Sequence, residues 1–367
     1  MRMNLLAPGI VGLVLFLSSG AAFPGDAAGR QGPDAFPGLL RVPDAFQKQY
    51  EKMDLWLSRR LAEWRPATYR SVRFGAYHVT ASEQLFRRTD RELDGLLLDV
   101  FEEAGVELVS AYLWPGNYEK QKERYHRLFR RIRKAGMALL IGLRFEGVPM
   151  TWAQYRSATM DFTRRIVGTV KPEYYAIVIE PTSHGEQKHG FKASVAEWIQ
   201  LVSEASSLSK RVSPRTKTLV GGHRLELDFL RTAADLRHLD AVGFNVYGRK
   251  GLRAIVKTIE HVENLGKETW ILETWLTLRK HPTFNAPWRQ PLDAKWIRFI
   301  AYLAQRYSVE GIIPFFTVRF VGYFPRNTDL AAVKQAFRAG RRTMVFRTYQ
   351  DVVAEVRKHT DTKGGKK

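Results

Sequence analysis

The chain has 367 residues, of which 45% are hydrophobic and 26% are charged, as in an ordinary globular protein with a sizeable core. It contains no cysteine, which excludes a disulfide framework, a thiolate metal site and a thiol nucleophile. Lys and Arg number 58 against 37 Asp and Glu, giving a net charge of +21 that either keeps the surface soluble or attracts polyanions. Because no nucleic-acid-binding motif accompanies this charge, we expect no nucleic-acid partner.

The first 26 residues indicate export. Leu5 to Leu17 is an apolar run, and small residues follow it as far as Ala22, as in a secretory signal peptide. The run is shorter than the roughly 20 residues that a membrane span needs. We therefore predict a signal peptide over residues 1–26, cleaved rather than kept as an N-terminal anchor, and a periplasmic or extracellular protein. A linker is expected over residues 27–40, and no later run is long enough to span a bilayer.

After the linker, an extra helix is expected over Val42–Trp64, and then short apolar runs alternate with segments of helical period. Each run has the length and composition of a strand that is buried on both faces. The eight runs are Val72–Val79, Val106–Leu113, Ala138–Phe145, Tyr174–Ile179, Thr218–Gly222, Ala241–Tyr247, Thr269–Leu272 and Gly311–Thr317.

Five of the intervening segments match the i, i+3, i+4, i+7 spacing of an amphipathic helix, beginning with Leu93, Leu96, Leu97 and Val100. Eight strand–helix units predict a single (β/α)8 TIM barrel of the α/β class over residues 41–360, with a basic tail over residues 361–367. The segment Asp329–His359 would supply the last outer helices. An open doubly wound sheet is the rival fold, but it normally has a Gly-rich phosphate loop after an early strand, which is missing here.

In such a barrel the working side chains lie at the C-terminal ends of the strands. Glu180 ends the fourth run and Glu273 the seventh, and a charge at the end of an apolar strand must be supported or its pKa shifts. Since these strands face each other across the ring, we expect carboxyl groups about 5 Å apart, as in a retaining glycosidase. The other strand ends carry side chains that suit sugar rings and hydroxyls, namely Tyr77, Trp114, Arg144, His223, Asn245, Tyr247, Trp275 and Phe316.

The segments Ile179-Glu180-Pro181, Asn245-Val246-Tyr247 and Ile271 to Trp275 resemble the clan A glycoside hydrolases, over an architecture that runs roughly from Arg70 to Phe320. The resemblance implies that Glu180 is the acid/base, that Glu273 is the nucleophile, and that Tyr247 is hydrogen-bonded to the nucleophile. It implies no cofactor. Two positions differ, because Ile179 stands where the clan usually has Asn, and Phe316 stands where a Trp platform is common.

The sequence therefore predicts a retaining glycoside hydrolase for an extracellular or envelope polysaccharide or oligosaccharide, and Arg144 suits an acidic sugar. Ile179 keeps a second hypothesis open, a non-catalytic carbohydrate-binding barrel derived from such enzymes. A third is a metal-dependent sugar-processing barrel with Glu180, His223 and Glu273 as ligands. The other strand ends show no clear Asp or second His, so we predict no metal. Nothing in the sequence indicates an oligomeric state.

Overall fold

The computed structural model describes residues 41–63, 71–78, 90–145, 147–278, 286–325 and 328–364, apart from the side chains of residues 184 and 359–364. The expected signal peptide and linker lie outside these residues. Within them, no helix is both long and apolar enough to cross a membrane.

Eight parallel strands close into a barrel in chain order, and the first strand is hydrogen-bonded to the eighth. This confirms the predicted (β/α)8 barrel, and each strand overlaps the run from which it was predicted. The strands are β1 Arg73–Tyr77, β2 Leu108–Leu113, β3 Ala138–Leu143, β4 Tyr174–Ile179, β5 Lys217–Gly222, β6 Ala241–Val246, β7 Glu268–Thr274 and β8 Gly311–Pro314.

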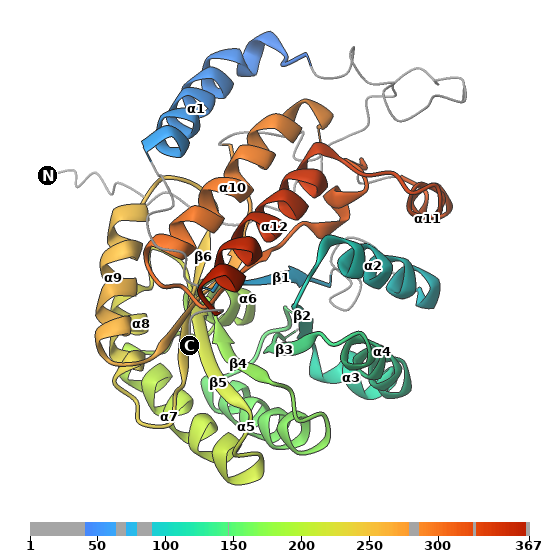
Figure 1. Ribbon diagram of the computed structural model, residues 1–367. Helices are drawn as coiled ribbons and strands as arrows, with labels where there is room; N and C mark the ends of the chain where they lie inside the picture. The colour runs from blue at the N-terminus through green and yellow to red at the C-terminus, as the bar shows by residue number, and fades with distance from the viewer. Residues whose placement is uncertain are drawn as a thin grey trace, which may run out of the picture. The chain divides into compact units, whose positions relative to one another are not determined.

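Helices surround the barrel (Figure 1). Thr151 and Ser194 begin two of them with reciprocal side-chain and backbone hydrogen bonds to the third helical residue, which satisfy N–H groups that have no partner inside the helix. The helices that follow strands are α2 Arg91–Ala104, α3 Pro115–Lys120, α4 Lys122–Lys134, α5 Trp152–Thr169, α6 Gln187–His189, α7 Val195–Val212, α8 Leu227–Ala234, α9 Leu252–Asn264, α10 Gln290–Arg306, α11 Leu330–Arg338 and α12 Met344–Gly364.

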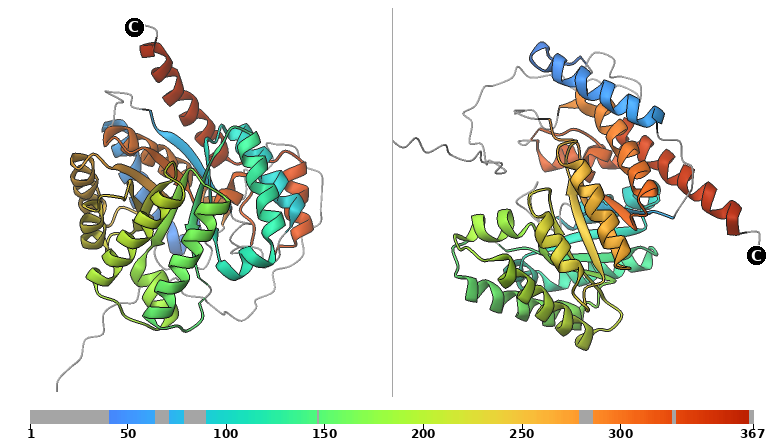
Figure 2. Two further views of the ribbon diagram at one scale, coloured as in Figure 1. Left: turned by 90° about the horizontal axis from the view of Figure 1, so that it is seen from below. Right: turned by 90° about the vertical axis from the view of Figure 1, so that its left-hand side faces the viewer.

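Both ends of the described chain are helical. The extra N-terminal helix is present as α1 (Asp44–Glu63) and packs on α10, where Lys295 contacts Asp54 at 2.6 Å and Ser58 at 2.9 Å. At the other end, α12 extends outward from the barrel (Figure 2) and continues to Gly364, into the segment that was expected to be a basic tail.

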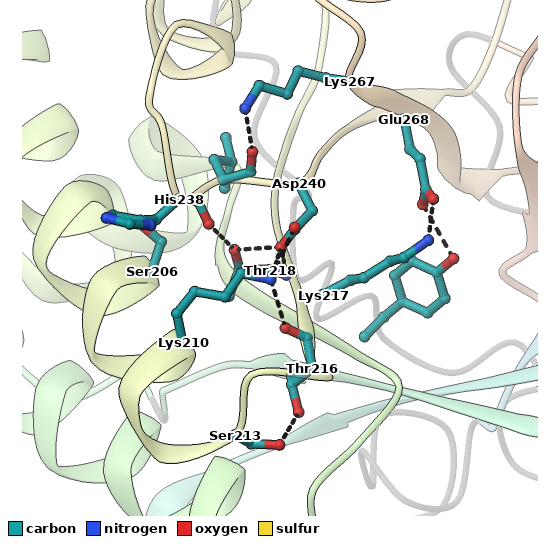
Figure 3. A network of polar contacts seen from close by, with 12 residues as sticks. Ser206, Lys210, Ser213, Thr216, Lys217, Thr218, His238, Asp240, Lys267 and Glu268 are labelled. Carbon is teal, nitrogen blue, oxygen red and sulfur yellow. Dashed lines mark hydrogen bonds and ion pairs between the residues drawn. The ribbon is translucent and has the colours of Figure 1, made fainter.

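An acidic residue directly precedes each even-numbered strand, at the N-terminal edge of the barrel. Three of these carboxylates accept a hydrogen bond from a backbone N–H of the preceding odd-numbered strand; the pairs are Glu107 with Phe74, Glu173 with Leu139 and Asp240 with Thr218, at 2.9, 2.9 and 2.7 Å. Figure 3 shows the Asp240 example, which also binds Lys210. The fourth, Glu310, pairs with the Arg73 side chain at 3.1 Å. This edge of the barrel is thus closed by structural polar contacts.

Apolar side chains fill the barrel below its C-terminal edge. Leu272 occupies space that Gly221 and Gly243 leave open, since a Cβ on either would come within 2.6 or 2.1 Å of a Leu272 methyl carbon. Ile179 packs against the same Gly221. Leu272 and Ile179 directly precede the two candidate glutamates, so these carboxylates emerge just above an apolar layer.

Candidate active site

Glu180 reaches the site through an unusual backbone conformation. It follows the last residue of β4, and its N–H continues the sheet by donating to the carbonyl oxygen of Gly221 at 2.8 Å. Its φ of 52° and ψ of 67° lie in the left-handed region, which is strained for a residue with a Cβ. Pro181 then begins a π-helical turn, Pro181–Glu186, of a kind often found at functional sites.

Two side chains hold the buried carboxylate of Glu180. The amide nitrogen of Asn245, from β6, donates to Oε1 at 2.8 Å, and the hydroxyl of Ser183 donates to Oε2 at 2.6 Å. The amide oxygen Oδ1 of Asn245 is buried and makes no hydrogen bond with the described residues. Ile179 contributes no polar group here, because it belongs to the apolar layer; the amide that contacts Glu180 comes from β6 instead.

Glu273 lies inside β7, one residue before the end of the strand, and is 3% exposed. The hydroxyl of Tyr247 donates to its Oε2, the hydrogen bond that the resemblance implies, whereas Oε1 has no hydrogen-bond partner among the described residues. Burial raises the pKa of Glu273 to about 7, and repulsion by Glu180 adds to this rise. Three neighbours act in the other direction and lower the pKa of Glu273, namely Tyr247, Tyr112 and Arg144. Glu180 therefore lies close enough to Glu273 to disfavour its ionised form.

Tyr112, from β2, is a site residue that the sequence analysis missed. Its ring fits because Gly142 on β3 has no side chain; a Cβ there would lie 2.5 Å from the ring. Burial raises the pKa of Tyr112 well above its usual value, and the nearby charge of Glu273 raises it further. The ring packs edge-on to Tyr77, which stacks on Phe315 at 4.3 Å. Tyr77 is thus placed in a buried aromatic wall beside Glu273.

Two cations approach the glutamates from neighbouring loops. Arg144 follows β3 directly, is 8% exposed, and helps to lower the pKa of Glu273. Lys188 lies half-buried in α6, on the loop after β4. Burial, and then the charge of Arg144, lower the pKa of Lys188 to about 8, while Glu180 and Glu273 act to raise it. Arg144 was predicted from its strand end, but no sequence pattern marked Lys188.

Glu226 connects the loops after β4 and β5. Its Oε1 accepts hydrogen bonds from the backbone N–H of Thr182 at 3.0 Å and from the Thr182 hydroxyl at 2.6 Å. Its Oε2 accepts one from the backbone N–H of His223 at 3.0 Å, and the His223 ring lies 3.2 Å away. His223, a predicted substrate contact, is therefore placed against Glu226, and together they brace the turn that follows Glu180.

Three predicted aromatic residues take different positions. Trp275 is fully buried, its ring lies 5.1 Å from the guanidinium of Arg319, and the edge of Phe316 contacts it, so it presents no exposed face to a sugar ring in this structure. Phe316 is half-buried and lies next to Phe315. Trp114 is half-buried before α3, and its indole N–H has no hydrogen-bond partner among the described residues.

A metal centre is not indicated by the side chains present. Among the described residues, no three His, Cys, Asp or Glu side chains gather in a way that could hold a metal ion. His223 is turned to Glu226, and the carboxylates of Glu180 and Glu273 are held by neutral donors. This arrangement fits acid–base and nucleophilic chemistry better than metal coordination.

No protein-family model matches the chain, and no curated protein matches it significantly. Solved structures do share its fold. An exo-β-1,4-mannosidase from Opitutaceae bacterium strain TAV5 superposes with a TM-score of 0.57 at 13% identity, over 80% of this chain and 61% of that one. GH5_18 from Streptomyces cattleya, solved in complex with GlcNAc, superposes with a TM-score of 0.57 at 12% identity, over 79% and 81% of the two chains. A β-glucanase from Saccharophagus degradans gives 0.50 at 14% identity, over 78% and 88%.

These neighbours are glycoside hydrolases built on the same closed barrel, so the resemblance to clan A enzymes is confirmed at the level of the fold. This chain spans 61% of the mannosidase, less than two thirds of its length.

Proposed function

We propose that this chain is a retaining glycoside hydrolase that acts on a polysaccharide or oligosaccharide outside the cytoplasm. One observation carries the proposal: two buried glutamates lie at the C-terminal ends of β4 and β7, where Glu180 helps to raise the pKa of Glu273, and each carboxylate is held by its own neutral donors. Two buried carboxyl groups on facing strands of such a barrel are the groups that an acid/base and a nucleophile require.

In the first step, the carboxylate of Glu273 attacks the anomeric carbon while the carboxylic acid of Glu180 protonates the departing glycosidic oxygen. The bond from the anomeric carbon to that oxygen breaks as the bond to Glu273 forms. Tyr247 steadies the attacking carboxylate through its hydrogen bond to Oε2. Oε1 makes no hydrogen bond with the described residues, which leaves it suited to be the attacking atom.

In the second step, the Glu180 carboxylate takes a proton from a water molecule as that water attacks the anomeric carbon. The ester to Glu273 breaks, the sugar leaves with its original configuration, and both glutamates return to their starting states. The amide oxygen Oδ1 of Asn245 is buried beside Glu180 and makes no hydrogen bond with described residues, so it suits a hydroxyl of the sugar bound there.

Substitution of each glutamate tests the assignment. Glu273→Ala should abolish turnover, because no glycosyl–enzyme can form. Glu180→Ala should keep activity on aryl glycosides with good leaving groups, which need no proton in the first step, and should lose it on natural linkages. Added azide should accelerate the Glu180 variant and give a glycosyl azide of retained configuration, measured by NMR.

Two outcomes would redirect the proposal. Full activity in both variants would show that these glutamates are not the catalytic pair. A parent protein that binds oligosaccharides in calorimetry but cleaves none on a broad panel would favour the non-catalytic barrel that Ile179 suggests.

A further inference from the structure

Asn245 lies beside both proposed catalytic glutamates. A register shift between β6 and β7 falls just before it, so that Asn245 is aligned with Glu273 on the neighbouring strand. Such bulges are common next to active sites, where they re-aim a side chain. From this position the side chain of Asn245 reaches Glu180, and its Nδ2 donates to Oε1 at 2.8 Å. Asn245 thus connects the proposed acid/base to the strand that carries the proposed nucleophile.

The two ends of this amide differ in their hydrogen bonding. Nδ2 has the carboxylate of Glu180 as a partner, whereas Oδ1 is buried and has no hydrogen-bond partner among the described residues. Because buried polar atoms in folded proteins are nearly always hydrogen-bonded, we expect the partner of Oδ1 to arrive with the substrate. The anomeric carbon must lie between Glu180 and Glu273, so the nearest donor is a hydroxyl of the sugar that is attacked.

The orientation of the amide depends on the proton of Glu180. When Glu180 is ionised, Nδ2 must face Oε1, because two acceptor oxygens cannot form a hydrogen bond without a proton between them. When Glu180 is protonated, the amide can also turn over, and Oδ1 then accepts a proton carried by Oε1. A proton bonded to Asn245 in this way is not available to a glycosidic oxygen. Ser183 does not select between the two arrangements, because its hydroxyl can donate to Oε2 or accept from it.

We propose that Asn245 is a relay through which a hydroxyl of the bound sugar places the proton of Glu180. When that hydroxyl donates to Oδ1, the amide cannot turn over, Nδ2 stays on Oε1, and the proton is confined to Oε2. As the glycosidic bond breaks, Oε2 gives this proton to the departing oxygen. Glu180 becomes a carboxylate, which Asn245 and Ser183 stabilise as donors. This inference rests on the proposed glycosidase function and concerns the control of its acid.

The test removes the sugar hydroxyl and the amide separately and together. A broad polysaccharide panel first identifies the sugar that the parent protein cleaves, and phenyl glycosides of that sugar or its disaccharide are made with and without each ring hydroxyl. At one ring position, loss of the hydroxyl should lower kcat/KM about tenfold more in the parent than in Asn245→Ala, as for a hydrogen bond linked to a charged group. Comparing the two proteins cancels the change in intrinsic reactivity that a deoxy sugar brings.

The leaving group separates a relay from a simple contact with the sugar. Phenyl glycosides need the proton of Glu180, whereas 2,4-dinitrophenyl glycosides do not. The coupling between the hydroxyl and Asn245 should therefore be about tenfold on phenyl glycosides and close to one on dinitrophenyl glycosides. Equal coupling on both kinds of substrate would show that Asn245 only binds the sugar. That result, or no coupling on either, refutes the relay and leaves the glycosidase function standing.

Ser183→Ala is the matched control, since Ser183 donates to the other oxygen of the same carboxylate. This variant should lose activity on phenyl glycosides but keep the hydroxyl dependence of the parent. Asn245→Leu retains the volume of the side chain without its polar atoms and should behave like Asn245→Ala, and melting curves check that all variants are folded. If the parent cleaves nothing on the polysaccharide panel, the glycosidase function and the relay fall together.

Discussion

Glu180 and Glu273 arrive at the site by different backbone routes. Glu273 is part of a regular strand, whereas Glu180 has a positive φ, which costs a residue with a side chain about 1–3 kcal/mol. Such a conformation persists only where its surroundings hold it, here through Gly221 at the backbone and Asn245 and Ser183 at the carboxylate. The position of the proposed acid/base therefore depends on β5 and β6 as well as on β4.

The charge of Glu180 should contribute to the pH dependence of Glu273, after the larger effect of burial. The pKa of Glu273 is raised to about 7 by burial and then by Glu180. Because protonated Glu273 cannot attack, kcat/KM of the parent on an activated aryl glycoside should fall as the pH drops through about 7. Glu180→Gln removes the repelling charge, so the fall should move to lower pH. Profiles of both proteins measure the shift, and coincident acidic limbs would contradict it.

The same raised pKa predicts a stability change. A carboxyl that binds its proton more tightly in the folded state does not destabilise the fold below its unfolded pKa of 4.5. The destabilisation grows as the pH rises from 4.5 and is complete above the folded pKa of about 7. Glu273→Gln should therefore raise the free energy of unfolding by about 3 kcal/mol above neutral pH, since each pKa unit is about 1.4 kcal/mol. The gain should shrink as the pH falls from 7 towards 4.5.

Urea unfolding at both ends of this pH range tests the change. Glu204→Gln is the control, because Glu204 is a surface residue paired with Arg156 and its pKa is lowered by that partner. This control should show no gain at high pH. A gain for Glu273→Gln that is the same at every pH would point to a packing effect and not to ionisation.

At the scale of elements, Glu226 makes the loops after β4 and β5 act as one unit. Glu226→Gln leaves one oxygen where two accepted hydrogen bonds, so it should loosen either Thr182 or His223 and misplace Glu180. We expect kcat/KM to fall about tenfold on substrates with poor leaving groups, because the loss of one hydrogen bond raises the activation free energy by about 1.4 kcal/mol. Activated aryl glycosides, which do not need the acid, should be much less affected.

If the loss of kcat/KM depends on the leaving group, Glu226 positions the acid Glu180 and the substitution has not simply disrupted the fold. If both kinds of substrate lost activity equally, Glu226 would have only a structural role. Rescue by Glu226→Asp is not expected, because the shorter side chain cannot span both loops. The melting temperature of each variant serves as the check on folding.

The elements that repeat locally could be predicted from the sequence. The eight apolar runs became the eight strands, and Glu180 and Glu273 could be located because each ends such a run. Side chains that are placed by contacts between distant parts of the chain could not be predicted. Lys188 joins the site only because α6 is fixed to the loop after β3, and Trp275 is buried because Arg319, from a turn after β8, covers its ring.

At the scale of the whole molecule, part of the positive charge is paired with acidic side chains at the surface. Many Arg and Lys side chains pair with acids on neighbouring helices, as Arg156 does with Glu204 and Arg165 with Glu119. These exposed pairs contribute little stability, typically below about 1 kcal/mol each. Exposed ion pairs of this kind therefore contribute little to what holds the barrel together.

Export is the remaining whole-molecule prediction. Residues Gly38 to Lys367 form a compact unit, and its first described helix begins at Asp44. Loss of a signal peptide should therefore leave the barrel intact, and a chain that begins at residue 27 should melt at the same temperature as the whole chain. N-terminal sequencing of protein recovered from the native envelope should find a start after Ala22. Recovery of intact Met1 in the membrane fraction would instead favour a retained anchor, with the barrel held at the membrane surface.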